Sequence, residues 1–147
     1  MRALGVTVTA VAVVNALGDV YDSSSGKIIA GAKDGHGGYI DTEKCMLDAD
    51  ISKLLTGNTT LVVVLTNARI DKLQANKLAD IAQDGFARAI RPVHTDYDGD
   101  TSFVMSTARI PVANFAVLEV ATVVAVENAI KNAAVSGAEY SIEYDEE

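Results

Sequence analysis

The sequence predicts an α/β protein in which helices pack on a sheet. Two segments, residues 6–14 and 60–67, are rich in β-branched residues, which favour strands over helices. Two other segments have helical character: one follows an N-terminal capping pattern at residue 71, and residues 112–134 form a long apolar stretch. The 147 residues are enough for one domain, so we expect residues 1–147 to form a single unit of helix and sheet layers.

The first part of the chain has the pattern of a β-meander. Residues 6–14 predict a strand, turns follow at residues 17–19 and 23–26, and residues 27–30 predict another strand. Residues 31–45 contain four glycines and little periodic apolar content, which indicates a loop. Residues 48–55 predict a short helix with Asp48 as its N-cap.

The second part predicts a buried strand, a helix, a further strand and a long helix. The strand at residues 60–67 is almost continuously apolar, which indicates burial on both of its faces. Asp71 with Gln74 resembles a capping box, and apolar residues then recur at helical spacing until Pro92 limits the helix. Residues 101–107 predict a strand. The helix at residues 112–134 is apolar on most faces, so we expect it to be largely buried, or to contact a second subunit.

Composition excludes several classes of function. The net charge of −8 argues against a nucleic-acid partner, because phosphate binding requires a basic surface. Cys45 is the single cysteine, so no internal disulfide forms. The first residues lack a signal-peptide pattern, and the most apolar stretch, residues 112–126, is interrupted by Asn114 and Glu119 and is short for a bilayer span. We therefore expect a cytoplasmic protein without a membrane partner.

The segment Gly57-Asn58-Thr59-Thr60 carries the strongest chemical signal, because it delivers two threonines to the start of a strand. The Thr59 hydroxyl can attack the carbonyl of Asn58, converting the peptide to an ester that water then hydrolyses. The freed α-amine, with an ordinary pKa of about 7.7–8.0, can act as the base for its own hydroxyl. The same tetrapeptide is also typical of an ordinary turn that enters a strand.

Three further blocks, taken in order, support the first interpretation. These are residues 13–20 with Asn15, residues 26–32, and residues 84–101 with the run Asp98-Gly99-Asp100. Together with the Asn58-Thr59-Thr60 segment they resemble the L-aminopeptidase/D-esterase family, which includes the β-peptidyl aminopeptidases. The resemblance extends from about residue 6 to residue 107. It implies an αββα sandwich related to the ornithine acetyltransferases, with Thr59 as nucleophile and self-cleavage between Asn58 and Thr59.

The resemblance also assigns roles to three other residues. Asn15 matches a residue that supplies the oxyanion hole of the family, and its side-chain amide suits that role, although asparagine is also a common turn residue. Asp98 matches a hydroxyl- or acid-bearing position of the family and Asp100 matches an acidic one, both beside the nucleophile. We expect Asp100 to hold the Thr59 amine and rank Asp98 second, although both also fit a solvated acidic turn. His94 completes a conceivable triad, but an N-terminal nucleophile carries its own base, so we interpret His94 as a turn residue.

No cofactor or metal is expected. The alternating acids at 96, 98 and 100 fail as a calcium loop, because the sixth and twelfth positions counted from Asp96 are Thr101 and Thr107. No cluster of histidine, cysteine and acidic residues has metal-ligand spacing. The glycines around His36 do not lead from a strand into a helix, so they do not form a phosphate-binding loop.

The chain departs from the family pattern in two respects. Family members carry a long segment upstream of the Asn15 block, and they usually have histidine where Gln83 stands. We therefore expect an incomplete sandwich, in which residues 1–58 correspond to the end of the family's α-subunit and residues 59–147 to its β-subunit. Partners are expected to be a small peptide or amide substrate and either further copies of this chain or a complementing upstream chain.

Three functions are consistent with this interpretation. The first is an aminopeptidase or amidase that acts on small peptides, amides or esters through an acyl-Thr59 intermediate. The second is a catalytically silent fragment or subunit that packs with a partner chain. The third is an acyltransferase of the ornithine acetyltransferase type, in which an amine replaces water as the acceptor.

Overall fold

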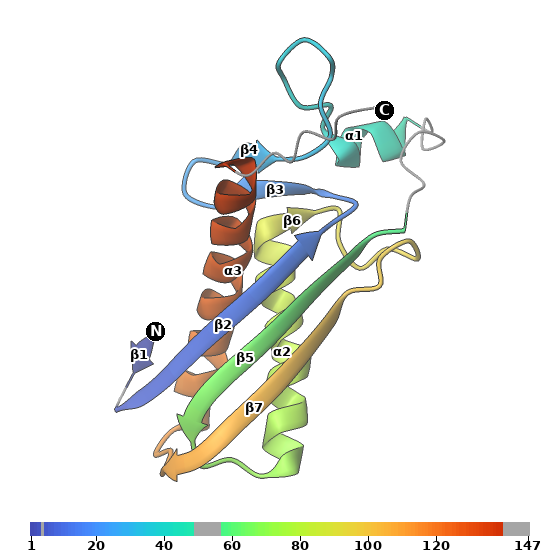
Figure 1. The fold of residues 1–147 in the computed structure, drawn as a ribbon. Coiled ribbons are helices and arrows are strands. Elements are labelled where there is room, and N and C mark those ends of the chain that lie inside the picture. The colour runs from blue at the N-terminus through green and yellow to red at the C-terminus, as the bar shows by residue number, and fades with distance from the viewer. Residues whose placement is uncertain (4, 49–56, 140–147) are drawn as a thin grey trace, which may run out of the picture.

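The computed structural model describes residues 1–3, 5–48 and 57–139. Its main sheet has four strands in the order β1-β2-β5-β7 (Figure 1). β2 pairs antiparallel with β1 and β5, whereas β5 and β7 run parallel, so that both of the latter begin at the same edge of the sheet. The bounds of the strands are β1 Arg2–Ala3, β2 Val6–Asn15, β5 Thr59–Ala68 and β7 Thr101–Ile110. The strands predicted at 6–14, 60–67 and 101–107 are thereby confirmed.

A second, smaller sheet lies at one end of the molecule and has the order β4-β3-β6. It contains β3 Asp19–Asp22, β4 Lys27–Ala30 and β6 Ile90–Arg91. The predicted meander is therefore wrong at its first turn, because β3 pairs with β4 and β6 and not with β2. Close packing at Gly18 accompanies this change of sheet: a Cβ added there would stand 2.0 Å from the carbonyl oxygen of Pro92.

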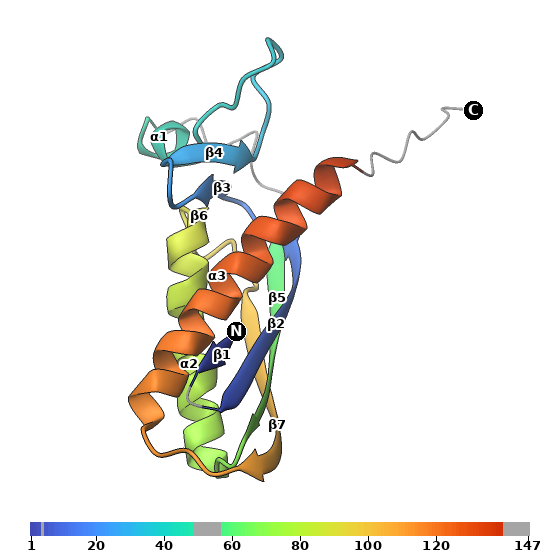
Figure 2. The same cartoon turned by 90° about the vertical axis from the view of Figure 1, so that its left-hand side faces the viewer.

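Two long helices cover one face of the main sheet (Figures 1 and 2). α2 Lys72–Ala89 begins at the predicted capping box, in which Asp71 and Gln74 exchange side-chain to backbone hydrogen bonds. α3 Phe115–Glu139 confirms the predicted C-terminal helix and packs against α2 and β2. At Gly85 the helices approach so closely that an added Cβ would lie 2.7 Å from Val126. The α/β class is confirmed, and these elements form one helix layer and one sheet layer of the sandwich that the resemblance implies.

The segment after the small sheet differs from the prediction. A short helix, α1 Thr42–Leu47, begins inside the stretch expected to be a loop, and the Asp41 side chain caps its N-terminus. Asp48 ends this helix as its C-cap. Asp41 acts as the N-cap of α1 because its carboxylate accepts the Lys44 N–H, which satisfies a donor of the first turn. The remainder of the helix predicted at 48–55 lies outside the described residues.

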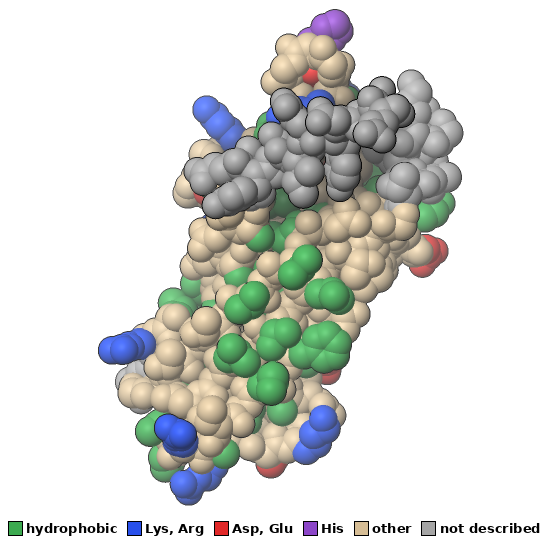
Figure 3. Space-filling model, in the orientation of Figure 1, with side chains coloured by type: hydrophobic (Ala, Val, Ile, Leu, Met, Phe, Trp, Pro, Cys, Tyr) green, Lys and Arg blue, Asp and Glu red, His purple; other side chains and the backbone are tan. Residues whose placement is uncertain are grey.

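The two faces of the main sheet have different surroundings. On the helix side, Val62, Val64, Leu78 and Phe86 are completely buried in a continuous core. The predicted burial of β5 on both faces is wrong, because its residues alternate between buried and accessible positions. The other side, called here the open face, presents a group of apolar side chains in Figure 3. Those exposed most are Val11, Val13, Leu61, Leu65, Phe103 and Met105.

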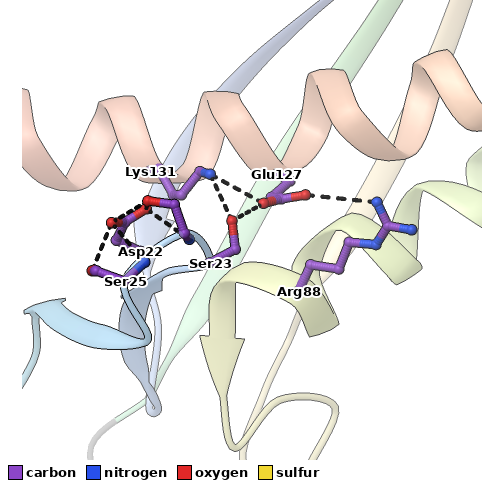
Figure 4. A network of polar contacts seen from close by, with 7 residues as sticks. Asp22, Ser23, Ser25, Arg88, Glu127 and Lys131 are labelled. Carbon is purple, nitrogen blue, oxygen red and sulfur yellow. Dashed lines mark hydrogen bonds and ion pairs between the residues drawn. The ribbon is translucent and has the colours of Figure 1, made fainter.

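A polar network joins the small sheet to both helices (Figure 4). The carboxylate of Glu127 on α3 accepts hydrogen bonds from Ser23 and Lys131, and it also lies 3.7 Å from the Arg88 guanidinium on α2. Burial alone would raise the pKa of Glu127, but the bonds from Ser23 and Lys131 outweigh it and lower the pKa. The network therefore fixes the β3–β4 turn against the helix layer.

Candidate active site

Thr59 is the first residue of β5, and its hydroxyl already contacts the bond that it is expected to attack. The Oγ1 atom donates a hydrogen bond of 2.6 Å to the carbonyl oxygen of Asn58. Side chains alternate along a strand, and Thr60, Val62 and Val64 are buried under the helices, so Thr59 faces the open side. The candidate nucleophile is therefore partly accessible, and its hydroxyl is hydrogen-bonded to the carbonyl of the preceding peptide.

A second donor reaches the same carbonyl oxygen. The backbone N–H of Gly99, just before β7, donates to the Asn58 oxygen at 3.0 Å. This bond belongs to a parallel bridge between Asn58 and Asp98, which continues the pairing of β5 and β7 beyond the strand starts. Two hydrogen-bond donors polarise the carbonyl, which favours nucleophilic attack on its carbon atom.

Asn15 lies directly across from Thr59 in the antiparallel ladder of β2 and β5. Its side-chain nitrogen donates to the carbonyl oxygen of Gly57 at 3.3 Å. The amide is exposed on the same side of the sheet as Thr59. Asn15 also lines a cavity of about 410 Å³, whose other walls come from the small sheet and from Ala133 and Ala134 of α3. The structure thus brings together the candidate nucleophile and the candidate amide donor.

Asp100 approaches the site from the helix-covered side of the sheet. Its Oδ1 atom accepts the backbone N–H of Thr60 at 2.7 Å, and its side chain is only 4% exposed. Burial raises the pKa of Asp100, an effect that the Thr60 N–H partly opposes by stabilising the carboxylate. The acid thus contacts the residue after Thr59 and stands one peptide unit from the amine that cleavage would free.

Asp98 has a different environment from Asp100. Its Oδ2 atom accepts hydrogen bonds from both the backbone N–H and the hydroxyl of Thr95, at 3.0 and 2.8 Å. The backbone N–H of Asp98 in turn donates to the Thr95 carbonyl oxygen. In this structure Asp98 closes a turn, and it contributes to the site by placing the adjacent Gly99.

His94 is closer to the site than the sequence indicated. It has a positive φ of 60°, its Nδ1 atom lies 3.7 Å from Oδ2 of Asp100, and its ring lies near that of Phe86. Gln83, the residue that replaces the family's histidine, donates to the Ser102 hydroxyl of β7. The sequence did not predict the Gly99 donor, because a backbone N–H is present in nearly every residue and is not reflected in composition. The only signal was the position of Gly99 within the Asp98-Gly99-Asp100 run.

Within the described ranges, no three histidine, cysteine or acidic residues are grouped to hold a metal ion. None of the helices described there is long and apolar enough to cross a membrane.

Comparison with known proteins places this geometry in context. The model of peptidase family S58 matches residues 2–144. An uncharacterized aminopeptidase of Mycobacterium leprae is 36% identical over 117 residues, covering 72% of this chain and 30% of the relative. A 6-aminohexanoate-oligomer endohydrolase of Kocuria sp. is 33% identical over 115 residues, covering 74% of this chain and 32% of the relative. The chain thus spans about a third of the length of these curated relatives.

Proposed function

This chain belongs to peptidase family S58, and on that premise we propose that it cleaves its own Asn58–Thr59 bond and then acts as an aminopeptidase or amidase. Its substrates are small peptides, amides or esters. The observation that carries this proposal is the contact of the Thr59 hydroxyl with its own preceding carbonyl, at 2.6 Å, on an accessible side of the sheet.

Self-cleavage proceeds in two steps. The Thr59 oxygen forms a bond to the carbonyl carbon of Asn58, the carbon–nitrogen bond breaks, and the hydroxyl proton passes to the departing nitrogen. The product is an ester between Asn58 and Thr59 with a free α-amine. Water then hydrolyses the ester, which leaves a carboxylate on Asn58 and restores the Thr59 hydroxyl.

Turnover of a substrate uses the same hydroxyl. The new α-amine takes the proton from the Thr59 oxygen, which bonds to the acyl carbon of the substrate. The bond from that carbon to the leaving amine or alcohol breaks, and the leaving group departs with the proton held by the α-amine. Water then takes the acyl group from Thr59 and restores its hydroxyl. Asp100, one peptide unit away, is suited to orient the ammonium form of the amine. Asn15, opposite Thr59, is suited to donate to the developing oxyanion once its amide turns from Gly57.

The open face requires a covering layer for this function. The apolar side chains of Val13, Leu61, Phe103 and their neighbours form a contiguous exposed surface of a kind that soluble monomers seldom tolerate. Because the match spans about a third of each curated relative, we propose that a complementing upstream segment supplies this layer and completes the substrate pocket. A second copy of the chain on this face is the alternative that light scattering of the purified protein would reveal.

Intact mass after expression is the most direct test of self-cleavage. Wild-type protein is expected to yield a fragment that begins Thr59-Thr60-Leu61. Thr59→Ala should remain whole, whereas Thr60→Ala, with the same chemical change one residue later and on the covered face, should still be cleaved. A folded wild-type chain that stays whole through prolonged incubation would overturn self-cleavage and leave a silent subunit as the function.

A second assay separates hydrolysis from acyl transfer. Cleaved protein is supplied with a p-nitroanilide amide in the presence and absence of an added amine acceptor. Release of the free acid identifies a hydrolase, whereas a product joined to the added amine identifies an acyltransferase. We expect the free acid, because the relatives named by function are an aminopeptidase and an oligomer endohydrolase.

A further inference from the structure

Gly99 lies against both partners of the bond that the proposed function cleaves. Its N–H donates to the Asn58 carbonyl oxygen at 3.0 Å, and a Cβ added to it would stand 2.8 Å from the Thr59 hydroxyl oxygen. We infer that the Gly99 N–H is the oxyanion donor for self-cleavage, and that the absence of a side chain there makes room for the nucleophile. This inference rests on the proposed self-cleavage at Asn58–Thr59.

The donor is aimed at the atom on which charge develops. When the Thr59 oxygen bonds to the Asn58 carbon, the carbonyl oxygen takes up the electron pair and becomes negative. In the resting arrangement the Thr59 hydroxyl also donates to that oxygen, but it must give up this proton during the attack. The Gly99 N–H remains on the oxygen throughout, and it is therefore available when stabilisation is needed most.

The requirement for glycine arises from space. The backbone φ of Gly99 lies outside the left-handed range that favours glycine, so other residues could adopt it. A Cβ would nevertheless stand 2.8 Å from Thr59 Oγ1 and 3.6 Å from the Asn58 oxygen. A side chain at position 99 would therefore displace the hydroxyl, the carbonyl or the donor itself.

The loop that carries Gly99 is fixed on both sides. Before it, Asp98 closes the turn back to Thr95 through two side-chain hydrogen bonds. After it, Asp100 is joined to the Thr60 backbone of the neighbouring strand. The N–H is thus held in place before reaction, which is the condition for effective stabilisation of a transition state. Asp98 is a positioning residue in this scheme, and its acceptor oxygen matters more than its charge.

The test measures cleavage of the full chain by intact mass over time, with thermal unfolding recorded for every variant. Gly99→Ala should slow cleavage by about 10²–10³-fold, the usual effect of losing one oxyanion donor. Gly57→Ala is the matched control, because this glycine directly precedes Asn58 but an added Cβ would meet nothing within 4 Å. It should be cleaved at the wild-type rate.

Hydroxylamine identifies the step that is affected, since it cleaves esters much faster than peptide bonds. Added hydroxylamine should accelerate chain cleavage in wild type, in which the ester forms, as measured by intact mass. It should not rescue Gly99→Ala, in which formation of the ester is blocked. Rapid release from Gly99→Ala with hydroxylamine would place the defect in hydrolysis and overturn the inference.

Asp98 provides an independent test that adds no side chain beside the nucleophile. Asp98→Ala removes both bonds to Thr95 and should slow cleavage, whereas Asp98→Asn keeps an acceptor oxygen and should restore it. Equal cleavage of wild type, Gly99→Ala and Asp98→Ala would overturn this inference and leave self-cleavage standing. Failure of wild type itself to cleave would overturn the proposed function, and this inference with it.

Discussion

The two faces of the main sheet are similarly apolar but differ in burial. On the covered face, Val8, Val62 and Val64 are at most 1% exposed beneath α2 and α3. On the open face, Val13 is 67% and Phe103 is 53% exposed. The hydrophobic effect stabilises the covered face within this chain, whereas the open face gains the same stabilisation only when another layer packs on it.

The candidate site is divided between these two faces. Thr59 and Asn15 lie on the open side, where a substrate could approach, whereas Thr60 and Asp100 lie on the covered side. The Thr59 hydroxyl and the Asp100 carboxylate are connected through the backbone at the start of β5, where each accepts or donates one hydrogen bond to a main-chain atom. Four predictions test this division, from the largest expected effect to the smallest.

The first prediction concerns Asp100, the buried acid. In cleaved and assembled protein, Asp100→Asn should reduce turnover of a p-nitroanilide amide by about 10²–10⁴-fold, the usual contribution of a positioned acid or base. Turnover is expressed per cleaved chain, so that incomplete processing does not contribute. Asp98→Asn, which retains the turn, serves as the control and should stay near wild type. Wild-type turnover in Asp100→Asn would mean that the acid is structural.

The second prediction compares two phenylalanines on opposite sides of the main sheet. Phe86→Ala, at 0% exposure beneath the covered face, should lower the free energy of unfolding by about 3–5 kcal/mol. Phe103→Ala, on the open face, should change it by about 1 kcal/mol or less in the isolated chain. Urea unfolding of both variants measures the difference. A loss at Phe103 equal to that at Phe86 would show that the open face is already covered in solution.

The third prediction concerns Glu127, which holds the helix layer to the small sheet. Glu127→Gln should lower the free energy of unfolding by about 1.5–3 kcal/mol near neutral pH, because charge-assisted hydrogen bonds from Ser23 and Lys131 are weakened. The pKa of Glu127 is lowered by folding, so its stabilisation is present above the unfolded pKa and is lost as pH falls through the folded one. The difference between wild type and variant should therefore shrink on acidification.

Asp80→Asn, at an exposed site on α2 outside this network, is the control for that series, because it also removes a carboxylate charge. A difference at Glu127 that stays constant down to about pH 3 would contradict the assigned direction of the pKa shift.

The fourth prediction places a charge on the open face. Val13→Lys should leave the unfolding free energy of the isolated chain within about 0.5 kcal/mol of wild type, because the side chain already meets water. It should nevertheless prevent the open face from binding its covering layer, whether that layer is an upstream segment or a second copy of the chain. Size-exclusion chromatography with light scattering would detect this loss of assembly. Leu73→Lys, at an exposed position on α2, controls for the added charge. Normal assembly of Val13→Lys would exclude the open face as the interface.

Local signals predicted most of the elements correctly. The β-branched run at residues 6–14 and the Asp71–Gln74 capping box depend on neighbours in sequence, and both are confirmed. The exposed side of β5 was missed, because Leu61, Val63 and Leu65 are as apolar as the buried Val62 and Val64. An apolar side chain indicates that its burial would be favourable. Whether it is buried depends on a covering layer, which the local sequence of β5 does not specify.

The residues predicted for the site lie near one another, whereas their contacts could not be predicted from the sequence. Asn58, Thr59 and Asp100 do meet at one sheet edge, as the order of motifs suggested. That Asp100 would bind the Thr60 N–H, and that His94 would lie beside it, depends on the register of β5 against β7 and on the packing of Phe86. Such pairings between distant segments are not encoded in local pattern.

Cleavage between Asn58 and Thr59 would divide the chain just before β5. Because β5 lies between β2 and β7 in the main sheet, its strand pairing determines whether the two pieces stay together. β2, in the first piece, pairs with β5, in the second, along a continuous ladder from Val8 and Thr66 to Asn15 and Thr59. The two pieces would therefore remain a non-covalent pair with a shared core, elute together under native conditions, and separate only in denaturant. A break in the covalent chain would thus release a terminus without releasing a fragment.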